Sequence, residues 1–396
     1  MAESSQLLTT AESVDRLCAD IRSAGLFGID TEFVGEHTYR PVLSLIQVVV
    51  PERTAIIDAQ AVPELSRFWE LVADPALVTV MHAAEQEARF CWYAIGALPE
   101  NLVDVQLAVG LLGDHFPMSY TNLVQSQLSV RLRQTQSRTD WTRRPLSDAQ
   151  LHYAEEDVQY LLPLWKRIGA QIVDLDRQAW LDEESAIRAD ALRRDLTQSR
   201  WWRIAGSQRM SRREMAAVRE IYRWREAKAA ARNSPRKRVL RDDLIISAAK
   251  SMPGTLDELR RMRGFERYGD RDVGAILDCV SAARALPDSE LPESRSTRGR
   301  APAQARMLVL LLEAVLESVC VEKRVDAGLV GGASDLRDLV QWHLQGRDPA
   351  QLPTLLQGWR ATVCGDILEA ALNGEISVRV ANPGASYPLS IDPGRG

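Results

Sequence analysis

Hydrophobic residues form short runs in the first hundred positions of the chain. Four segments rich in Val, Ile and Leu are separated by polar or Pro-containing breaks and are predicted to be strands: residues 26–33, 43–50, 54–58 and 77–82. Residues 86–95 then carry apolar side chains at the spacing of one helix face. A further short strand is expected at 102–105. This order predicts an α/β domain, with a mixed sheet covered by helices.

A strong helical pattern lies between residues 146 and 168. Ser147 and Gln150 have the spacing of a capping box, which marks the start of a helix. Apolar residues then form a stripe with helical spacing: Leu151, Ala154, Val158, Leu161, Leu162 and Trp165. One continuous helix is therefore predicted over 146–168. Tyr153 and Asp157 lie four residues apart and share a helix face beside this stripe.

The remaining chain is predicted to be mostly helical and to form two further units. Residues 215–231 have helical periodicity, whereas 287–303 are poor in large apolar side chains and are typical of a linker. Residues 375–380 alternate like a strand. The predicted boundaries are a first domain at 1–195, a helical domain at 207–287, a linker at 288–304 and a smaller, mostly helical module at 305–396.

Charge is distributed unevenly along the 396 residues. The chain carries 49 Lys and Arg against 54 Asp and Glu, so its net charge of -5 gives no overall attraction to a polyanion. Residues 209–285 differ, with 19 basic against 11 acidic side chains. Nucleic-acid affinity is therefore expected in this second unit.

Cysteine usage and hydropathy favour a cytoplasmic protein. The five cysteines are widely spaced and form no CxxC pair, which argues against a disulfide framework and against a structural zinc site. The longest apolar stretch, residues 307–316, falls short of the roughly 18 residues that a membrane span needs. No secretory signal is recognised at the N-terminus. No GxxxxGK[ST] loop is present, so no nucleotide-triphosphate cofactor is expected.

Two pairs of residues are candidates for chemistry. Asp30 and Glu32 alternate along a predicted strand and therefore project from one face. At about 4 Å and an effective dielectric constant near 20, their repulsion is roughly 4 kcal/mol, and a divalent cation would relieve it. The alternative is two solvated acids at a strand end. Similarly, the phenol of Tyr153 could orient a metal-bound water beside Asp157, or could simply pack at the edge of the core.

Three motifs, taken together and in order, resemble ribonuclease D, a family of DEDD-type 3′-5′ exonucleases with a ribonuclease H-like fold. The first is Asp30-Thr31-Glu32-Phe33, followed by Glu36, Thr38, Tyr39, Pro41, Leu43, Leu45 and Gln47. The second is the segment 80–87, VMHAAEQE, and the third is the segment 137–157, SRTDWTRRPLSDAQLHYAEED. Tyr153 would place the chain in the DEDDy subclass.

The resemblance implies a two-metal site for Mg²⁺ or Mn²⁺. The implied ligands are Asp30, Glu32, Glu87 and Asp157, with Asp30 bridging both ions and Tyr153 orienting the attacking water. Glu87 is a departure, since the family usually has Asp at this position. The added methylene moves the carboxylate by about 1 Å, a displacement that can cost around 100-fold in rate if nothing compensates. Glu85 is the alternative ligand if the register slips.

Neighbouring motif residues are expected to support the site. His82 is interpreted as a hydrogen-bonded structural residue rather than a ligand, and Asp104 as a structural or supporting acid. Phe33 and Tyr39 could stack on the terminal bases of a nucleic acid. For Phe33, packing in the fold is the alternative.

The second unit resembles the helicase-and-ribonuclease-D C-terminal (HRDC) domain, a small helical bundle that commonly holds nucleic acid. The resemblance lies in residues 221–226, residue 232, residues 235–245 and residues 259–265. The candidate phosphate contacts are Arg236, Lys237, Arg238 and Arg241, with solvation of a loop as the alternative. Residues 355–360 and 373–378 also resemble the tail of ribonuclease D relatives, where a second HRDC-like module often lies.

These features predict a cytoplasmic, two-metal 3′-5′ exoribonuclease. Its expected substrate is structured RNA with a single-stranded 3′ end, such as a tRNA precursor, and its expected products are nucleoside 5′-monophosphates. One alternative is a DNA-directed exonuclease, because carboxylates and metals do not distinguish the sugars. The other is a catalytically weakened RNA-binding protein that retained the fold after Glu87 arose.

Overall fold

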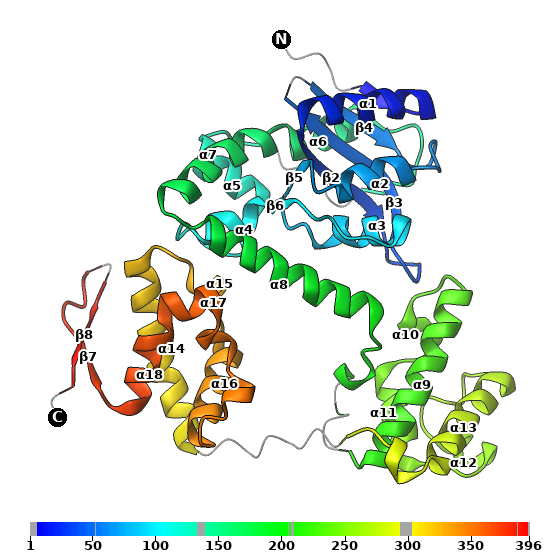
Figure 1. Cartoon of the computed structure of the whole chain (residues 1–396). Helices are drawn as coiled ribbons and strands as arrows, with labels where there is room; N and C mark the ends of the chain where they lie inside the picture. Colours follow the sequence, from blue (N-terminus) through cyan, green and yellow to red (C-terminus); the bar gives the residue numbers. More distant parts are fainter. Residues whose placement is uncertain are drawn as a thin grey trace. The chain divides into compact units, whose positions relative to one another are not determined.

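The computed structural model describes residues 6–51, 53–132, 139–204, 206, 210–293, 303–385 and 387–394. The chain divides into two compact units (Figure 1). The first unit comprises residues 1–32, 43–193 and 301–396, and the second comprises residues 33–42 and 194–300. The segment that follows the first long strand therefore belongs to the same unit as the predicted HRDC domain.

A six-stranded mixed sheet forms the centre of the first unit, in the order β1-β4-β3-β2-β5-β6. Its strands are β1 (Gln6–Leu8), β2 (Leu26–Val34), β3 (Val42–Val50), β4 (Arg53–Asp58), β5 (Val78–Met81) and β6 (Leu102–Asp104). β3 and β4 are antiparallel, whereas the pairs β1–β4, β2–β5 and β5–β6 are parallel. The five predicted strands and the mixed sheet are confirmed, and β1 is an additional edge strand that the apolar pattern did not predict.

Helices cover both faces of this sheet (Figure 1). On one face lie α1 (Ala11–Ala24), α2 (Ser66–Ala73) and α3 (Glu85–Ile95), whose apolar side chains share a core with Phe27, Ile29 and Ile57. On the other face lie α4 (Val105–Gly110), α5 (Tyr120–Leu128), α6 (Asp148–Gln159) and α7 (Leu161–Asp174), which pack around Val49, Val80 and Val103. The central strand β2 is therefore enclosed on both sides.

The prediction of one helix over 146–168 is wrong, because the chain breaks at Tyr160 into α6 and α7. Pro163 explains the break. Proline lacks a backbone N–H, and its ring clashes with the carbonyl of the residue four positions earlier, here Gln159. The predicted start is confirmed, since Ser147 and Gln150 form a capping box.

The C-terminal residues pack within the first unit, where their core is continuous with that of the exonuclease-like domain. Helix α8 (Gln178–Thr197) is followed after the second unit by α14 (Ala303–Lys323), α15 (Ala327–Val330), α16 (Ala333–Leu344), α17 (Gly358–Arg360), a π-helical turn (Ala361–Gly365) and α18 (Asp366–Asn373). Short 3-10 turns lie at Pro349–Gln351 and Thr354–Leu356. The predicted strand at 375–380 is confirmed as β7 (Ile376–Val380), which pairs with β8 (Leu389–Pro393).

The second unit is a helical bundle with its own core. It contains α9 (Arg212–Ala231), α10 (Arg236–Val239), α11 (Asp242–Ser251), α12 (Leu256–Arg261) and α13 (Asp270–Ala285), with 3-10 turns at Trp201–Arg203 and Asp288–Glu290. Fully buried Ile221, Leu240, Ile245 and Phe265 lie at its centre. Among the helices of the described ranges, none combines the length and the apolar composition that crossing a membrane requires.

Candidate active site

Strand β2 places two carboxylates on one face of the sheet. Asp30 and Glu32 are two residues apart, so their side chains project from the same side. Gly28 precedes them on that face, and a Cβ atom there would lie 2.8 Å from Val49 Cγ1 and 3.0 Å from Leu161 Cβ. Only glycine permits this approach, which brings the start of α7 against β2.

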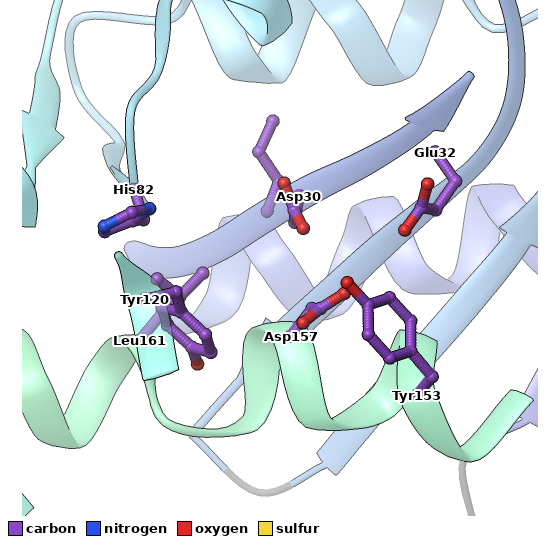
Figure 2. A pocket seen from close by; sticks show the side chains of 8 residues that line it. Asp30, Glu32, His82, Tyr120, Tyr153, Asp157 and Leu161 are labelled. Carbon is purple, nitrogen blue, oxygen red and sulfur yellow. The ribbon is translucent and has the colours of Figure 1, made fainter. Parts of the chain in front are cut away.

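A pocket lies over these carboxylates (Figure 2). Its walls are formed by residues from β2, α5, α6, α7 and the end of β5: Ile29, Asp30, Glu32, His82, Tyr120, Tyr153, Asp157 and Leu161. Figure 2 shows Tyr153 and Asp157 on α6 facing the two acids of β2. The Tyr153 hydroxyl points to the Asp157 carboxylate and is hydrogen-bonded to it. The structure thus brings together four of the five predicted catalytic residues around one pocket.

Polar contacts hold α6 and the segment before it to the sheet. Thr54 Oγ1 on β4 donates to Glu155 Oε1 on α6 at 3.1 Å. The Arg144 guanidinium donates two hydrogen bonds to the buried Asp58 carboxylate, at 2.6 and 2.7 Å. The Trp141 ring lies 5.9 Å from the ring of Tyr153, measured between centroids. These contacts fix the helix face that carries Tyr153 and Asp157.

The fifth predicted residue, Glu87, is not among the residues that line the pocket. It is 5% exposed in the first turn of α3, and its Oε1 accepts a hydrogen bond of 2.6 Å from Thr31 Oγ1. Its charge is close enough to raise the pKa of Glu32. Glu85 instead forms an exposed ion pair of 2.7 Å with Arg89. The structure therefore favours Glu87 over Glu85 as the acid of the second motif.

Asp104 and His82 support the turn that leads into α3. Asp104 accepts hydrogen bonds from the backbone N–H groups of Ala83 and Ala84, both at 3.0 Å. Ala83 has a positive φ of 56°, which is strained for a residue with a side chain, so this carboxylate stabilises an unusual turn. The Nε2 atom of His82 lies 2.9 Å from the Met118 carbonyl oxygen. Both positions match the supporting roles predicted for them.

The electrostatics of the pocket disfavour four ionised carboxylates. Burial, reinforced by the neighbouring Asp157 charge, raises the pKa of Asp30 to about 8. Burial and nearby acids also raise the pKa of Glu32 to about 9, that of Glu87 to about 8 and that of Asp157 to about 7. Burial and the same acids raise the pKa of the Tyr153 phenol. Divalent cations would relieve this repulsion and keep the acids ionised.

The donor chemistry of the pocket fits a hard cation. Its candidate ligand atoms are carboxylate oxygens, the type that Mg²⁺ and Mn²⁺ prefer. Within the described ranges, no three acidic, His or Cys side chains already converge as the ligands of one ion do.

The predicted phosphate contacts lie around α10, and three of the four have partners in the structure. Arg236 Nε donates to Glu226 at 2.6 Å, and Arg241 pairs with Asp243 at 2.6 Å. Arg238 Nη2 lies 3.2 Å from the His37 Nδ1 atom. For Lys237, the structure records no hydrogen bond or ion pair to any described residue. Phe33, the remaining predicted contact, is 37% exposed near the end of β2.

Comparisons with known proteins agree with this geometry. Residues 5–172 match the 3′-5′ exonuclease family, and residues 214–280 match the HRDC domain. Ribonuclease D of Gluconacetobacter diazotrophicus is 34% identical over 379 residues, covering 94% of each chain. The chain belongs to the ribonuclease D family. Ribonuclease D of Escherichia coli K12 is 28% identical over 372 residues, covering 93% of this chain and 98% of the relative.

The fold of this ribonuclease D family member also matches a solved structure over nearly its whole length. The crystal structure of E. coli RNase D, described as "an exoribonuclease involved in structured RNA processing", superimposes with a TM-score of 0.81 at 26% identity. The match covers 94% of this chain and 99% of the other. The predicted α/β exonuclease fold and helical HRDC domain are confirmed, and the chain is a 3′-5′ exoribonuclease. Family membership also supports nucleic-acid binding and the use of a divalent metal.

Three residues of the site were not predicted from the sequence. Thr31 belongs to the first motif, but it points to the opposite face of the strand from Asp30 and Glu32. Nothing in the local sequence indicates its hydrogen bond to Glu87. Gly28 precedes the motif, and its role depends on the approach of α7. Tyr120 comes from a segment without a motif, and no sequence signal linked it to the pocket.

Proposed function

We propose that this chain is a two-metal-ion exoribonuclease that shortens structured RNA from the 3′ end. The observation that carries the proposal is the pocket in which Asp30 and Glu32 of β2 face Tyr153 and Asp157 of α6. Asp30, Glu32, Glu87 and Asp157 would hold two Mg²⁺ or Mn²⁺ ions. When bound, such ions would acidify the attacking water and stabilise the charge that develops on the leaving 3′-oxygen.

The protein's own groups orient the reaction. Tyr153 stays protonated at neutral pH, because burial and the Asp157 charge raise the pKa of its phenol. It can therefore position a water through its hydroxyl group. It is a poor base at neutral pH, because even an unperturbed phenol has a pKa of about 10. Attack of water on the last phosphodiester breaks the bond between phosphorus and the 3′-oxygen. The products are a nucleoside 5′-monophosphate and an RNA one nucleotide shorter with a free 3′-hydroxyl.

We propose that the substrate is an RNA with folded structure and a single-stranded 3′ end, a tRNA precursor being the type suggested by the family. The HRDC domain would contribute sequence-independent phosphate contacts through Lys237, Arg238 and Arg241. Phe33 would contact the terminal bases. Replacing the three basic residues together with Ala should weaken RNA binding and flatten its dependence on salt, because each lost phosphate contact lowers the salt slope by roughly one. An unchanged slope would place the RNA on another surface.

A time course on a 5′-labelled tRNA with a 3′ extension tests the activity. In Mg²⁺ or Mn²⁺ the products should form a ladder with single-nucleotide steps, and mononucleotides should accumulate. Matched RNA and DNA oligonucleotides test the DNA-directed alternative, which predicts equal or faster loss of DNA. RNA binding without mononucleotide release would favour the catalytically weakened alternative.

The domain limits of 1–195, 207–287 and 305–396 remain our proposal, as does a second HRDC-like module at the C-terminus. The structure adds that residues 301–396 share a compact unit with the exonuclease domain. We also propose that the enzyme acts in the cytoplasm without a nucleotide-triphosphate cofactor.

A further inference from the structure

Tyr39 lies in the segment 33–42, which continues the catalytic strand and belongs to the same compact unit as the HRDC helices. Its backbone N–H donates to Asn233 Oδ1 at 3.2 Å. Its hydroxyl group donates to Glu226 Oε2 at 3.1 Å, and the Arg236 guanidinium carbon lies 4.6 Å from the centroid of its ring. We call Tyr39, Glu226, Asn233 and Arg236 the clasp.

The clasp is held by an ion pair between Glu226 and Arg236, which each also contact Tyr39. Glu226 has a side chain that is 17% exposed, and it accepts from Arg236 Nε at 2.6 Å in addition to Tyr39. It also accepts from Arg225 Nη2 of α9 at 3.3 Å, outside the clasp. Arg236 therefore has a carboxylate on one side and an aromatic ring on the other, an arrangement in which a guanidinium is held by a salt bridge and a cation–π contact. Burial and the Glu226 charge also raise the pKa of the Tyr39 phenol, which keeps its hydroxyl a donor.

Covalent continuity links the clasp to catalysis. Tyr39 follows Glu32 by seven residues, and an extended chain spans at most about 3.3 to 3.6 Å per residue. The chain between the anchored Tyr39 and the catalytic Glu32 can therefore span at most about 25 Å. A second contact, from Arg238 to His37, reinforces the same segment.

We propose that Tyr39 is a positioning residue that ties the HRDC domain to the catalytic strand through Glu226 and Arg236, so that structured RNA held by the domain presents its 3′ end to the pocket. This inference rests on the proposed action on structured RNA. A substrate that touches both the HRDC domain and the pocket gains from the short tether between Tyr39 and Glu32, because its second contact forms at a high effective concentration. A very short substrate reaches the pocket alone and gains nothing.

In the clasp, Arg236 positions Tyr39, whereas the sequence predicted it to contact phosphate. The two roles predict different effects of substitutions at Tyr39 and Arg236. If Arg236 acts through the clasp, Tyr39→Ala and Arg236→Ala should each have the full effect, and the double variant should be no worse than either. If Arg236 binds phosphate, the two effects should add, and Arg236→Ala should lower the salt slope of binding by roughly one.

The experiment compares a 3′-extended tRNA with a tetraribonucleotide for the unmodified enzyme and four variants: Tyr39→Ala, Tyr39→Phe, Arg236→Ala and the Tyr39→Ala/Arg236→Ala double variant. Tyr39→Ala should raise KM for the tRNA about tenfold with kcat unchanged, and Tyr39→Phe, which keeps the ring, about threefold. Hydrolysis of the tetranucleotide should change by less than about twofold. Arg223→Ala is the matched control, since Arg223 lies on α9 with Glu226 and pairs with Glu220 outside the clasp.

The tRNA affinity of the same variants, measured by fluorescence anisotropy, tests the clasp independently of turnover. It should fall in parallel with the rise in KM. An unchanged KM and affinity for tRNA, or equal losses on both substrates, would overturn the inference. Failure of the proposed function would instead appear in the unmodified enzyme, as an absence of tRNA hydrolysis.

Discussion

The Thr31 hydroxyl donates a hydrogen bond of 2.6 Å to the Glu87 carboxylate, joining strand β2 to the first turn of α3. Thr31 stands between Asp30 and Glu32 in the sequence, and side chains alternate along a strand, so it points away from their face. The longer side chain of glutamate is thus part of a specific contact beside the proposed metal ligands. This relationship gives the departure from the usual aspartate a physical basis.

Glu87→Asp should therefore lower activity rather than restore it. The shorter side chain withdraws the carboxylate by about 1 Å, a displacement that can cost around 100-fold in rate. Steady-state hydrolysis of a short RNA in Mg²⁺ and in Mn²⁺ measures the effect, with Glu85→Asp on the exposed face of α3 as the control. A variant more active than the unmodified enzyme would show that Glu87 is an imperfect ligand. A variant with unchanged activity in both metals would place Glu87 outside the metal site.

The raised pKa values make the metal-free protein less stable at alkaline pH. Free Asp and Glu titrate near pH 4, whereas Asp30, Glu32, Glu87 and Asp157 titrate between about 7 and 9 in the folded chain. Between about pH 4 and pH 9, the folded state therefore binds more protons than the unfolded state. The contribution of these four acids to the free energy of unfolding is greatest below about pH 4. It is lost as the pH rises through their folded-state pKa values of about 7 to 9.

Thermal unfolding in EDTA from pH 5 to pH 9 tests this dependence. The Tm should fall with rising pH, by about 1 to 2 °C for each kcal/mol lost, and Mn²⁺ should restore it most at high pH. Asp30→Asn removes one buried acid and should raise the metal-free Tm at pH 8.5. A Tm for Asp30→Asn below that of the unmodified protein at this pH would contradict the electrostatic account.

Tyr153→Phe should distinguish a role in positioning the attacking water from a role in binding RNA. The variant keeps the ring that packs beside Trp141 but loses the hydroxyl group bonded to Asp157. We expect kcat to fall by about 10- to 100-fold with little change in RNA affinity. Single-turnover hydrolysis and anisotropy on one RNA measure the two quantities. Equal losses of rate and affinity would assign Tyr153 a packing role instead.

Arg177 should be a major source of stability within the first unit. Its buried guanidinium donates to the Leu111 and Lys323 carbonyls, and at 2.6 Å to the Arg324 carbonyl, linking α4 to the end of α14. Arg177→Met leaves these carbonyls without a donor and should lower the free energy of unfolding by about 2 to 3 kcal/mol. Urea denaturation measures the loss. Exposed Arg193→Ala is the control, at less than about 1 kcal/mol, and an equal effect would refute the assignment.

Local spacing was enough to predict the residues that sit close together in the sequence. Asp30 with Glu32 follows from strand alternation, and Tyr153 with Asp157 from the helical repeat. The Thr31–Glu87 bond and the Tyr39–Arg236 contact could not be predicted this way, since they join residues separated by 56 and 197 positions. Their formation depends on tertiary packing, which no local period encodes.

The fold shows the same division between local and non-local information. Buried strands and capped helices have strong local patterns, and they were predicted. The three-residue edge strand β1 is too short to show a period, and it forms through parallel pairing with β4, about fifty residues later. The helix breaks at Tyr160 because of Pro163. The prediction of one continuous helix relied on the apolar stripe and gave this proline too little weight.

Calorimetric titration of Mn²⁺ into the metal-free enzyme at pH 7 tests the central claim most directly. The claim is that buried acids with raised pKa values form the metal site. We expect two ions per chain and a net release of protons, seen as a dependence of the heat on the ionisation enthalpy of the buffer. We also expect Asp30→Asn and Asp157→Asn to lose tight binding. Two tightly bound ions in the Asp30→Asn variant, or binding without proton release, would contradict the claim.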